Sequence, residues 1–214
     1  MTSSAADPAA PIGITAHELR YLFNLEPTEV ARANRRRFSL PEVADESDAI
    51  GAGAATLLVR GLARVADGTL VLDEITGLIG YVITHARVWT ELALLAPEIT
   101  DGALILTADD LSLLFTPRSL AIFEVVALRP GSPVRDTVLP LARAFLDESD
   151  DRIAVVRAST DTGEESAAVV RIGGDRWRVA HDVPRPGAPE LPASAYVDRD
   201  RVSALADLAK VVTR

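Results

Sequence analysis

Apolar and polar residues follow their most regular pattern in the stretch 47–96. Apolar residues recur at helical spacing from Ile50 to Val65, and Ser47 or Asp48 can cap the free N–H groups of a first turn. A helix is therefore predicted over residues 47–65. Gly61 lies inside this helix and is interpreted as a site of close packing against another helix.

The second half of this stretch predicts a turn, a helix and a strand. Asp67-Gly68 is a turn signal, and apolar residues return at helical spacing over residues 73–87, behind Asp73 as a good N-cap. Over residues 88–95 the period changes to that of a strand, and Pro97 ends the run. The predicted order is helix, turn, helix, strand.

Two short helices are predicted before this stretch. Thr15 and Glu18 have the spacing of a capping box at the start of a helix over residues 15–25, and a second helix is predicted over residues 28–35. Residues 1–13 are polar, rich in alanine and proline, and lack the basic and apolar regions of a signal peptide. We predict a disordered N-terminal tail over residues 1–13 and a single α+β domain over residues 14–214.

Strands dominate the second half of the chain. The predicted elements are a turn at Asp101-Gly102, strands 103–107, 111–116, 120–128, 153–158, 166–172 and 176–183, a helix over 134–146, and a last helix behind Asp198 or Asp200. Strands in runs, flanked by helices rather than alternating with them, indicate an α+β fold with a mostly antiparallel central sheet.

One weak internal similarity is present. Residues 14–23 (ITAHELRYLF) resemble residues 106–115 (LTADDLSLLF), because a threonine, an alanine, two leucines and a phenylalanine coincide. Such a match is compatible with an ancient duplication or with chance, since true repeat arrays recur several times.

Composition narrows the classes of function. The chain has 214 residues, of which 48% are hydrophobic, so it can bury a sizeable core, and its longest apolar runs are shorter than the roughly 20 residues of a membrane span. The formal net charge is −9 and Lys210 is the single lysine, so specific binding to duplex DNA is not expected. Cysteine is absent, which excludes disulfides and thiolate chemistry. Without an export signal the cytoplasm is the expected compartment, and the Lys-poor composition is typical of a GC-rich bacterial genome.

No catalytic, cofactor-binding or metal-binding residues are predicted, and we do not expect an enzyme. His17, His85 and His181 are far apart and lack metal-ligand spacing. Phosphate-loop, dinucleotide-binding and serine-hydrolase motifs are absent from the sequence. The carboxylate pairs Asp109-Asp110 and Glu164-Glu165 are interpreted as solvated turns, and the two tryptophans as core or sheet residues.

A basic cluster, Arg35-Arg36-Arg37, stands out in this acidic chain. It is compatible with binding a phosphate or an acidic partner. It is also compatible with the solvent-facing end of a helix that leads into an edge strand at Phe38. The second interpretation is favoured because charge runs usually face solvent.

Residues 57–94 resemble the EspG family, the cytosolic chaperones of actinobacterial type VII (ESX) secretion. The similarity rests on an Ala-rich helix ending in Arg60-Gly61-Leu62, the turn Asp67-Gly68, the amphipathic helix 73–87 and the outer strand 88–95. A strand-like RRRFSLPEV segment upstream and the hairpins of residues 153–183 are similar in order. The resemblance covers residues 15–212 and implies a central antiparallel sheet with helical ends in a quasi-twofold arrangement.

The resemblance implies a non-catalytic cytosolic binding protein that holds small helical secreted proteins soluble. Helix–turn–helix–strand also resembles a winged-helix core, so a transcriptional regulator is the alternative. The acidity of the chain argues against major-groove reading, and so does a second helix whose only basic residues are His85 and Arg87. An enzyme of unrecognised type is the third hypothesis. The partner's identity, the binding surface and the oligomeric state are not predicted.

The hairpin over residues 111–128 suggests where a partner binds. Leu111, Leu113 and Phe115 alternate with Ser112, Leu114 and Thr116, so both faces of this strand carry leucine. A strand that is apolar on both faces is sandwiched between layers or covered by a partner. We therefore expect a bound helical protein to cover one face of this hairpin.

Overall fold

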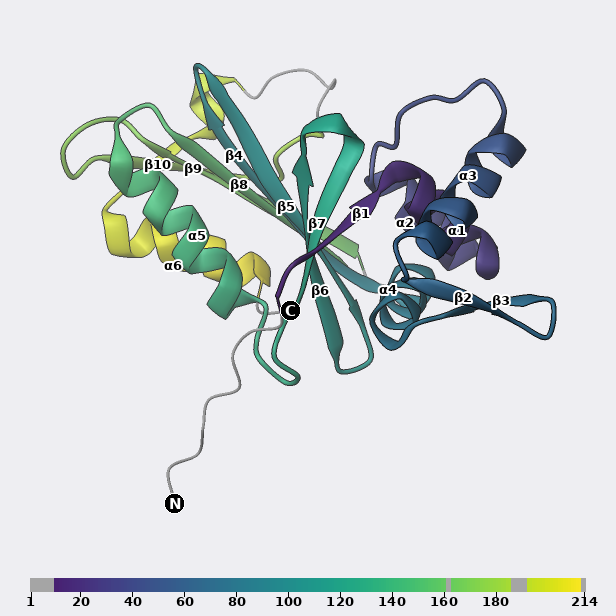
Figure 1. Ribbon diagram of the computed structural model, residues 1–214. Coiled ribbons are helices and arrows are strands. Elements are labelled where there is room, and N and C mark those ends of the chain that lie inside the picture. The colour runs from purple at the N-terminus through teal and green to yellow at the C-terminus, as the bar shows by residue number, and fades with distance from the viewer. Residues whose placement is uncertain (1–9, 161–162, 186–191, 213–214) are drawn as a thin grey trace. The chain divides into compact units, whose positions relative to one another are not determined.

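A computed structural model describes residues 10–160, 163–185 and 192–212 (Figure 1). Within these residues the strands form two antiparallel sheets, one of nine strands in the order β1-β7-β6-β5-β4-β8-β9-β10-β11 and one of two strands, β2-β3. Six α-helices accompany them in the described part of the chain. The prediction of an α+β fold with a mostly antiparallel sheet is confirmed.

The chain divides into two compact units, which are described separately. The first comprises the chain up to Arg87 together with Leu106–Pro130, and the second comprises Val88–Ile105 and the chain from Gly131 onward. β1 (Ile12–Thr15) begins the described structure of the first unit after two residues without regular structure. Residues 1–9 of the predicted tail lie outside the described residues, and a single domain over residues 14–214 stays a prediction.

The first two helices begin where the sequence predicts. α1 (Ala16–Leu25) has the complete capping box, in which the Glu18 N–H donates to Thr15 Oγ1 at 3.2 Å and the Thr15 N–H donates to Glu18 Oε2 at 2.8 Å. α2 (Glu29–Arg37) begins at an N-cap, Thr28, and includes the whole basic cluster in its last turn. The edge strand predicted at Phe38 is wrong, because a loop connects α2 directly to α3.

The helix predicted over residues 47–65 is shorter than expected. α3 (Glu46–Val59) has Asp45 as its N-cap, in place of the predicted Ser47 or Asp48, and Gly61 ends it with a φ of 71°. The Gly61 N–H donates to Leu58 O and the Leu62 N–H to Leu57 O, which is the Schellman arrangement of a helix C-terminus. The interpretation of Gly61 as an interior packing glycine is therefore wrong.

A hairpin replaces the predicted turn between two helices. β2 (Ala63–Ala66) and β3 (Thr69–Leu72) pair across Asp67 and Gly68, whose positive φ angles suit a two-residue turn of the type that matches strand twist. Asp73 then caps α4 (Glu74–His85) as predicted, accepting from the Thr76 N–H at 2.7 Å. The helix–turn–helix that supported the winged-helix alternative is absent from residues 46–85.

Replacing Gly61 by alanine is expected to lower the free energy of unfolding by about 1 kcal/mol, because a Cβ strains the left-handed backbone of a helix C-terminus. Gly61→Asn should cost less, since asparagine tolerates this conformation better than alanine. Urea denaturation followed by circular dichroism measures both variants. Equal stability of the alanine variant and the parent would contradict the assignment of this helix end.

An apolar core fills the first unit between its helices and the strands β1, β6 (Leu111–Arg118) and β7 (Ile122–Ala127). The Phe38 ring is its hub, with its centroid 5.5 Å from Phe23, 5.0 Å from Phe115 and 5.4 Å from Phe123, all in edge-to-face contact. Ile79 of α4 is also buried here. These contacts fix the loop after α2 against the sheet.

β5 (Ile99–Ala108) corrects one expectation. The strand runs through Asp101-Gly102, where a turn was predicted. Gly102 instead allows β5 to approach β4 (Val88–Ala96) closely, because a Cβ at this position would lie 2.6 Å from Leu92 O. The two similar segments also differ in structure: residues 14–23 lie mainly in α1, whereas residues 106–115 form the β5–β6 turn and its flanking strands. The same residue pattern therefore serves two conformations.

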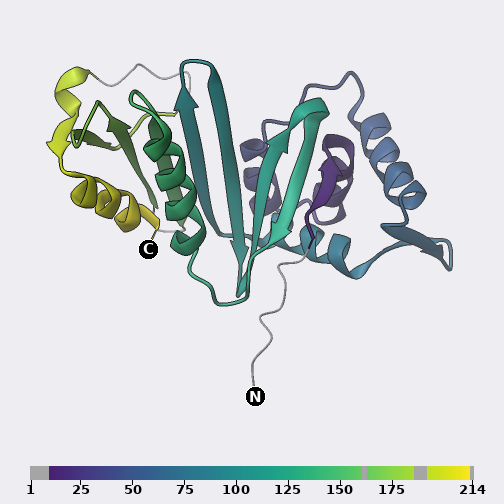
Figure 2. The same cartoon turned by 60° about the vertical axis from the view of Figure 1, so that its left-hand side comes forward.

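The second unit is a sheet with helices on one face (Figure 2). Its elements are β4 (Val88–Ala96), α5 (Arg135–Glu148), β8 (Ile153–Thr160), β9 (Gly163–Arg171), β10 (Trp177–His181), β11 (Val197–Arg199) and α6 (Arg201–Val212). The predicted strands and both helices are present. Leu141 of α5 and Val202 of α6 are exposed, and Leu94 of β4 is half-buried.

Candidate functional site

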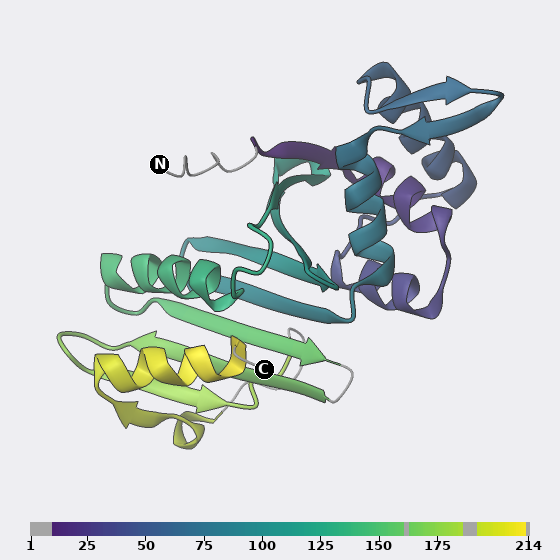
Figure 3. The same cartoon turned by 90° about the horizontal axis from the view of Figure 1, so that it is seen from below.

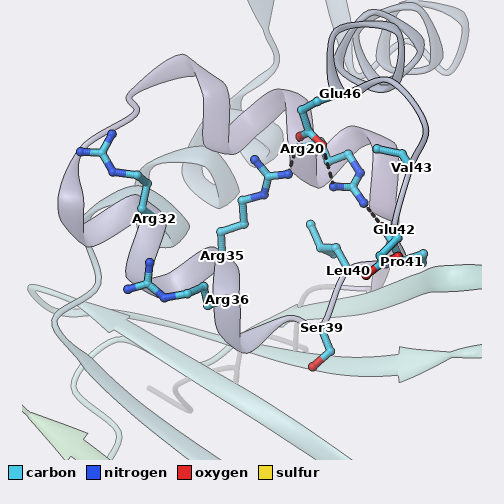
Figure 4. A pocket seen from close by; sticks show the side chains of 10 residues that line it. All are labelled: Arg20, Arg32, Arg35, Arg36, Ser39, Leu40, Pro41, Glu42, Val43 and Glu46. Atoms are coloured by element: carbon cyan, nitrogen blue, oxygen red, sulfur yellow. Dashed lines mark hydrogen bonds and ion pairs between the residues drawn. The ribbon is translucent and has the colours of Figure 1, made fainter.

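A basic pocket lies in the first unit where α1, α2 and the start of α3 meet (Figure 4). Its volume is about 580 Å³. The lining residues combine arginines, glutamates and small apolar side chains: Arg20, Arg32, Arg35, Arg36, Ser39, Leu40, Pro41, Glu42, Val43 and Glu46. We call this the arginine pocket.

Glu46 is the ionic centre of the arginine pocket. Its carboxylate accepts from Arg20 Nη1 at 3.3 Å and from Arg35 Nη2, so helices α1, α2 and α3 each contribute one charge. Arg20 also donates to Pro41 O, and its side chain is only 4% exposed. Its Nε has no hydrogen-bond partner in the described structure. Buried and doubly anchored, Arg20 gives the pocket a positive wall in a defined position.

Arg32 and Arg36 form the open side of the arginine pocket. They are exposed, lie one turn apart on α2, and point from the same helix face (Figure 4). Arg32 donates to Pro27 O at 2.9 Å, and no described residue pairs with Arg36. The sequence placed Arg36 correctly at a solvent-facing helix end, but it could not associate this cluster with Arg20 and Glu46, which are distant in the chain.

Four apolar side chains between the end of α3 and the start of α4 are exposed. Val59 is 88% exposed and Val65 63% exposed, and Val71 and Ile75 are exposed as well. We call these four residues the hairpin surface, because the β2–β3 hairpin joins them and extends beyond the neighbouring helices (Figure 3). Val65 and Val71 lie on opposite faces of the two strands, so neither face of the hairpin is fully covered.

The sequence pattern did not predict the hairpin surface, because the spacing of Val65 fits the apolar face of a helix. A signal for the hairpin was present. Asp-Gly flanked by alternating apolar residues, as in Arg64–Val71, is the strongest short-range indication of a two-residue hairpin. Isolated two-stranded hairpins are marginal in water, and exposed apolar patches often mark interaction sites.

Two of the three histidines lie beside carboxylates. His85 lies 3.2 Å from Glu26 and stacks on Tyr81, and His181 lies 4.0 Å from Asp207. The Tyr81 hydroxyl donates to Asp109, and this hydrogen bond raises the pKa of Tyr81. In the residues that the structure describes, no group of three or more histidine, aspartate and glutamate side chains could hold a metal ion.

Asp207 is the most strongly partnered carboxylate of the second unit. Burial favours its neutral form, but the ammonium of Lys210 at 2.6 Å and the guanidinium of Arg199 at 3.4 Å outweigh burial and lower the pKa of Asp207. Because the pKa is lowered on folding, this carboxylate stabilises the fold above its unfolded pKa and stops doing so as the pH falls through the folded value. Asp207 and Lys210 both lie in α6, so their ion pair connects successive turns of this helix.

The strand predicted to be covered by a partner is partly covered by its own unit. Leu113 and Phe115 are buried on the side that faces the helices. Leu111, Leu114 and Thr116 are half-buried. Trp89 and Trp177 are both buried, as the core interpretation predicted.

Neither models of protein families nor curated proteins match this chain. Among solved structures, the chain resembles the Mycobacterium tuberculosis type VII secretion system chaperone EspG5, solved in complex with a PE25–PPE41 dimer. The TM-score is 0.57, the identity is 9%, and the match covers 95% of each chain. The chain therefore shares the fold of EspG5, and the resemblance to the EspG family is confirmed at the level of structure. In the described residues, no helix is both long and apolar enough to cross a membrane.

Proposed function

We propose that this protein is a non-catalytic chaperone of the type VII secretion kind. In this proposal it acts in the cytoplasm of an actinobacterium and holds small helical secreted proteins soluble before export. The client binds through apolar contacts, and no cofactor, metal or nucleic acid takes part. The observation that carries the proposal is the structural match to EspG5 along 95% of both chains.

The hairpin surface supports the proposal independently of that match. A chaperone without chemistry needs exposed apolar area that a client can cover. Val59, Val65, Val71 and Ile75 supply such area on or beside a hairpin that pairs with no third strand among the described residues. Interfaces of standard size bury about 800 Å² per partner, so the client would extend beyond these four side chains.

Co-expression with small secreted proteins encoded beside this gene is expected to yield a co-purifying complex. Val65→Glu should weaken that complex at least about tenfold, because a charge would replace an apolar contact in the interface. Isothermal titration calorimetry with the isolated client measures the loss.

Val202→Glu is the matched control, since Val202 is 78% exposed and lies on α6 of the second unit. Its complex should have the parental affinity. Failure of every neighbouring secreted protein to co-purify would contradict the chaperone proposal. Equal weakening by both substitutions would contradict the role of the hairpin surface but not the chaperone proposal.

A further inference from the structure

We propose that the arginine pocket binds an acidic segment of a client polypeptide, with client carboxylates on Arg32 and Arg36 and client apolar side chains on the loop between α2 and α3. This inference rests on the proposed function, because it assigns a second contact to the same client. The hairpin surface would supply apolar affinity, and the arginine pocket would select clients by charge.

The charge of the arginine pocket is opposite to that of the whole chain. Four arginines and two glutamates line it, which leaves a local excess of two positive charges. The whole chain carries a formal net charge of −9. A basic concavity in an acidic protein attracts anions locally, while the remaining surface repels them. An acidic ligand would therefore be directed to this pocket.

The positive groups of the arginine pocket are held in place by the fold. Asn34 is buried on the inner side of α2, where its Nδ2 donates to Ile83 O at 3.1 Å and Ala86 O at 2.8 Å. These bonds anchor α2 to the C-terminal end of α4. Phe38 anchors the following loop in the aromatic core. Arg32 and Arg36 therefore project from a rigid helix, which lowers the entropic cost of binding.

Glu46 shows which chemistry the pocket accepts. Its carboxylate forms ion pairs with Arg20 and Arg35, so arginines of this pocket already bind a carboxylate within the protein. Arg36, one residue along from Arg35, has no such partner among the described residues. A client carboxylate at Arg32 and Arg36 would extend this ionic row along α2.

The lining favours an extended peptide over a compact phosphate. Arg35 and Arg36 lie in the last turn of α2, where the helix dipole is negative and the free carbonyl groups disfavour a dianion. The exposed guanidinium groups are spread along the helix instead of converging on one point (Figure 4). Leu40, Pro41 and Val43 add apolar lining. Carboxylates spaced along a chain, with apolar residues between them, suit this arrangement.

The test uses the purified full-length protein and a fluorescein-labelled synthetic peptide in which glutamate and leucine alternate. Fluorescence anisotropy should show binding that weakens with added salt, because exposed ion pairs are screened. The Arg32→Ala/Arg36→Ala variant should bind about three- to thirtyfold more weakly, which corresponds to the loss of two exposed ion pairs. The same peptide with glutamine in place of glutamate should not bind.

The matched control is Arg129→Ala/Arg176→Ala, which removes the same charge at two exposed arginines outside the pocket. It should retain parental affinity, and equal weakening in both double variants would show a general charge effect and overturn the proposal. Inorganic phosphate serves as a competitor. Displacement of the peptide by millimolar phosphate at constant ionic strength would overturn the choice of a peptide ligand.

Glu46→Gln provides a variant that should gain affinity. Removing the internal carboxylate frees Arg20 and Arg35 from their ion pairs, so the peptide should bind several times more tightly than to the parent. Unchanged or weaker binding would overturn the assignment of Glu46 as the internal occupant. Because these measurements need no client, peptide binding without a co-purifying client contradicts the chaperone function alone, and a client complex without peptide binding contradicts this inference alone.

Discussion

Arg60→Met is expected to lower the free energy of unfolding by about 3–5 kcal/mol, because it leaves a buried carboxylate without its cation. Glu18 is 0% exposed, and Arg60 Nη1 donates to its two carboxylate oxygens at 2.9 and 2.7 Å. Arg60 Nη2 also donates to Gly13 O at 2.7 Å, so one side chain connects the end of α3 to both β1 and α1. Methionine keeps the apolar stem and removes only the charge and the donors.

A double variant separates the charge from the packing. Glu18→Gln together with Arg60→Met removes both charges, and it should recover more than about half of the lost stability, since no ion remains buried. Arg64→Met is the control, because Arg64 is exposed on β2 and should change stability by less than about 0.5 kcal/mol. Guanidinium denaturation measures all three. A loss below about 1 kcal/mol for Arg60→Met would contradict the role of this ion pair.

Gly53→Ala is expected to destabilise the protein by about 3 kcal/mol or more, because α1 and α3 are in backbone contact at this position. A Cβ at Gly53 would lie 2.1 Å from His17 O and 2.6 Å from its carbonyl carbon. Both atoms are backbone, so no side-chain rotation can relieve the overlap. The two helices would have to separate, which would also disturb the Glu18–Arg60 ion pair that lies between them.

Gly51 is the matched control for Gly53. It lies in the same helix with no atom within 4 Å of its Cβ position, so Gly51→Ala should stabilise the protein by about 0.5–1 kcal/mol through helix propensity. Opposite signs for these substitutions, measured by thermal and urea denaturation, would confirm the close approach of α1 and α3. Two stabilising effects would contradict it.

Local signals predicted the elements that short-range chemistry determines. The capping box of Thr15 and Glu18 and the N-cap of Asp73 depend on residues within one helical turn, so the starts of α1 and α4 follow from the sequence. The strands of the second unit follow from alternating and β-branched residues. Strands in runs then predicted the fold class. The EspG resemblance came from the same order of elements, which the structural match later confirmed.

Predictions failed where one local pattern is compatible with two structures. Leu62 and Val65 have the spacing of a helix face, but the Schellman end at Gly61 and the Asp67-Gly68 turn place them in and beside a hairpin. A short apolar run fits both the helical and the strand period, so packing against the rest of the unit decides which structure forms.

The candidate sites depend on contacts between residues that are far apart in the chain. The sequence alone determined that α2 ends in three arginines and that α3 begins with acidic residues. Only the tertiary structure placed Arg20 beside Glu46, because the packing of α1 against α3 brings together residues from separate helices. The tertiary structure also leaves Val65 exposed. Whether another strand or a helix covers a hairpin depends on how the whole chain folds and not on the sequence of the hairpin.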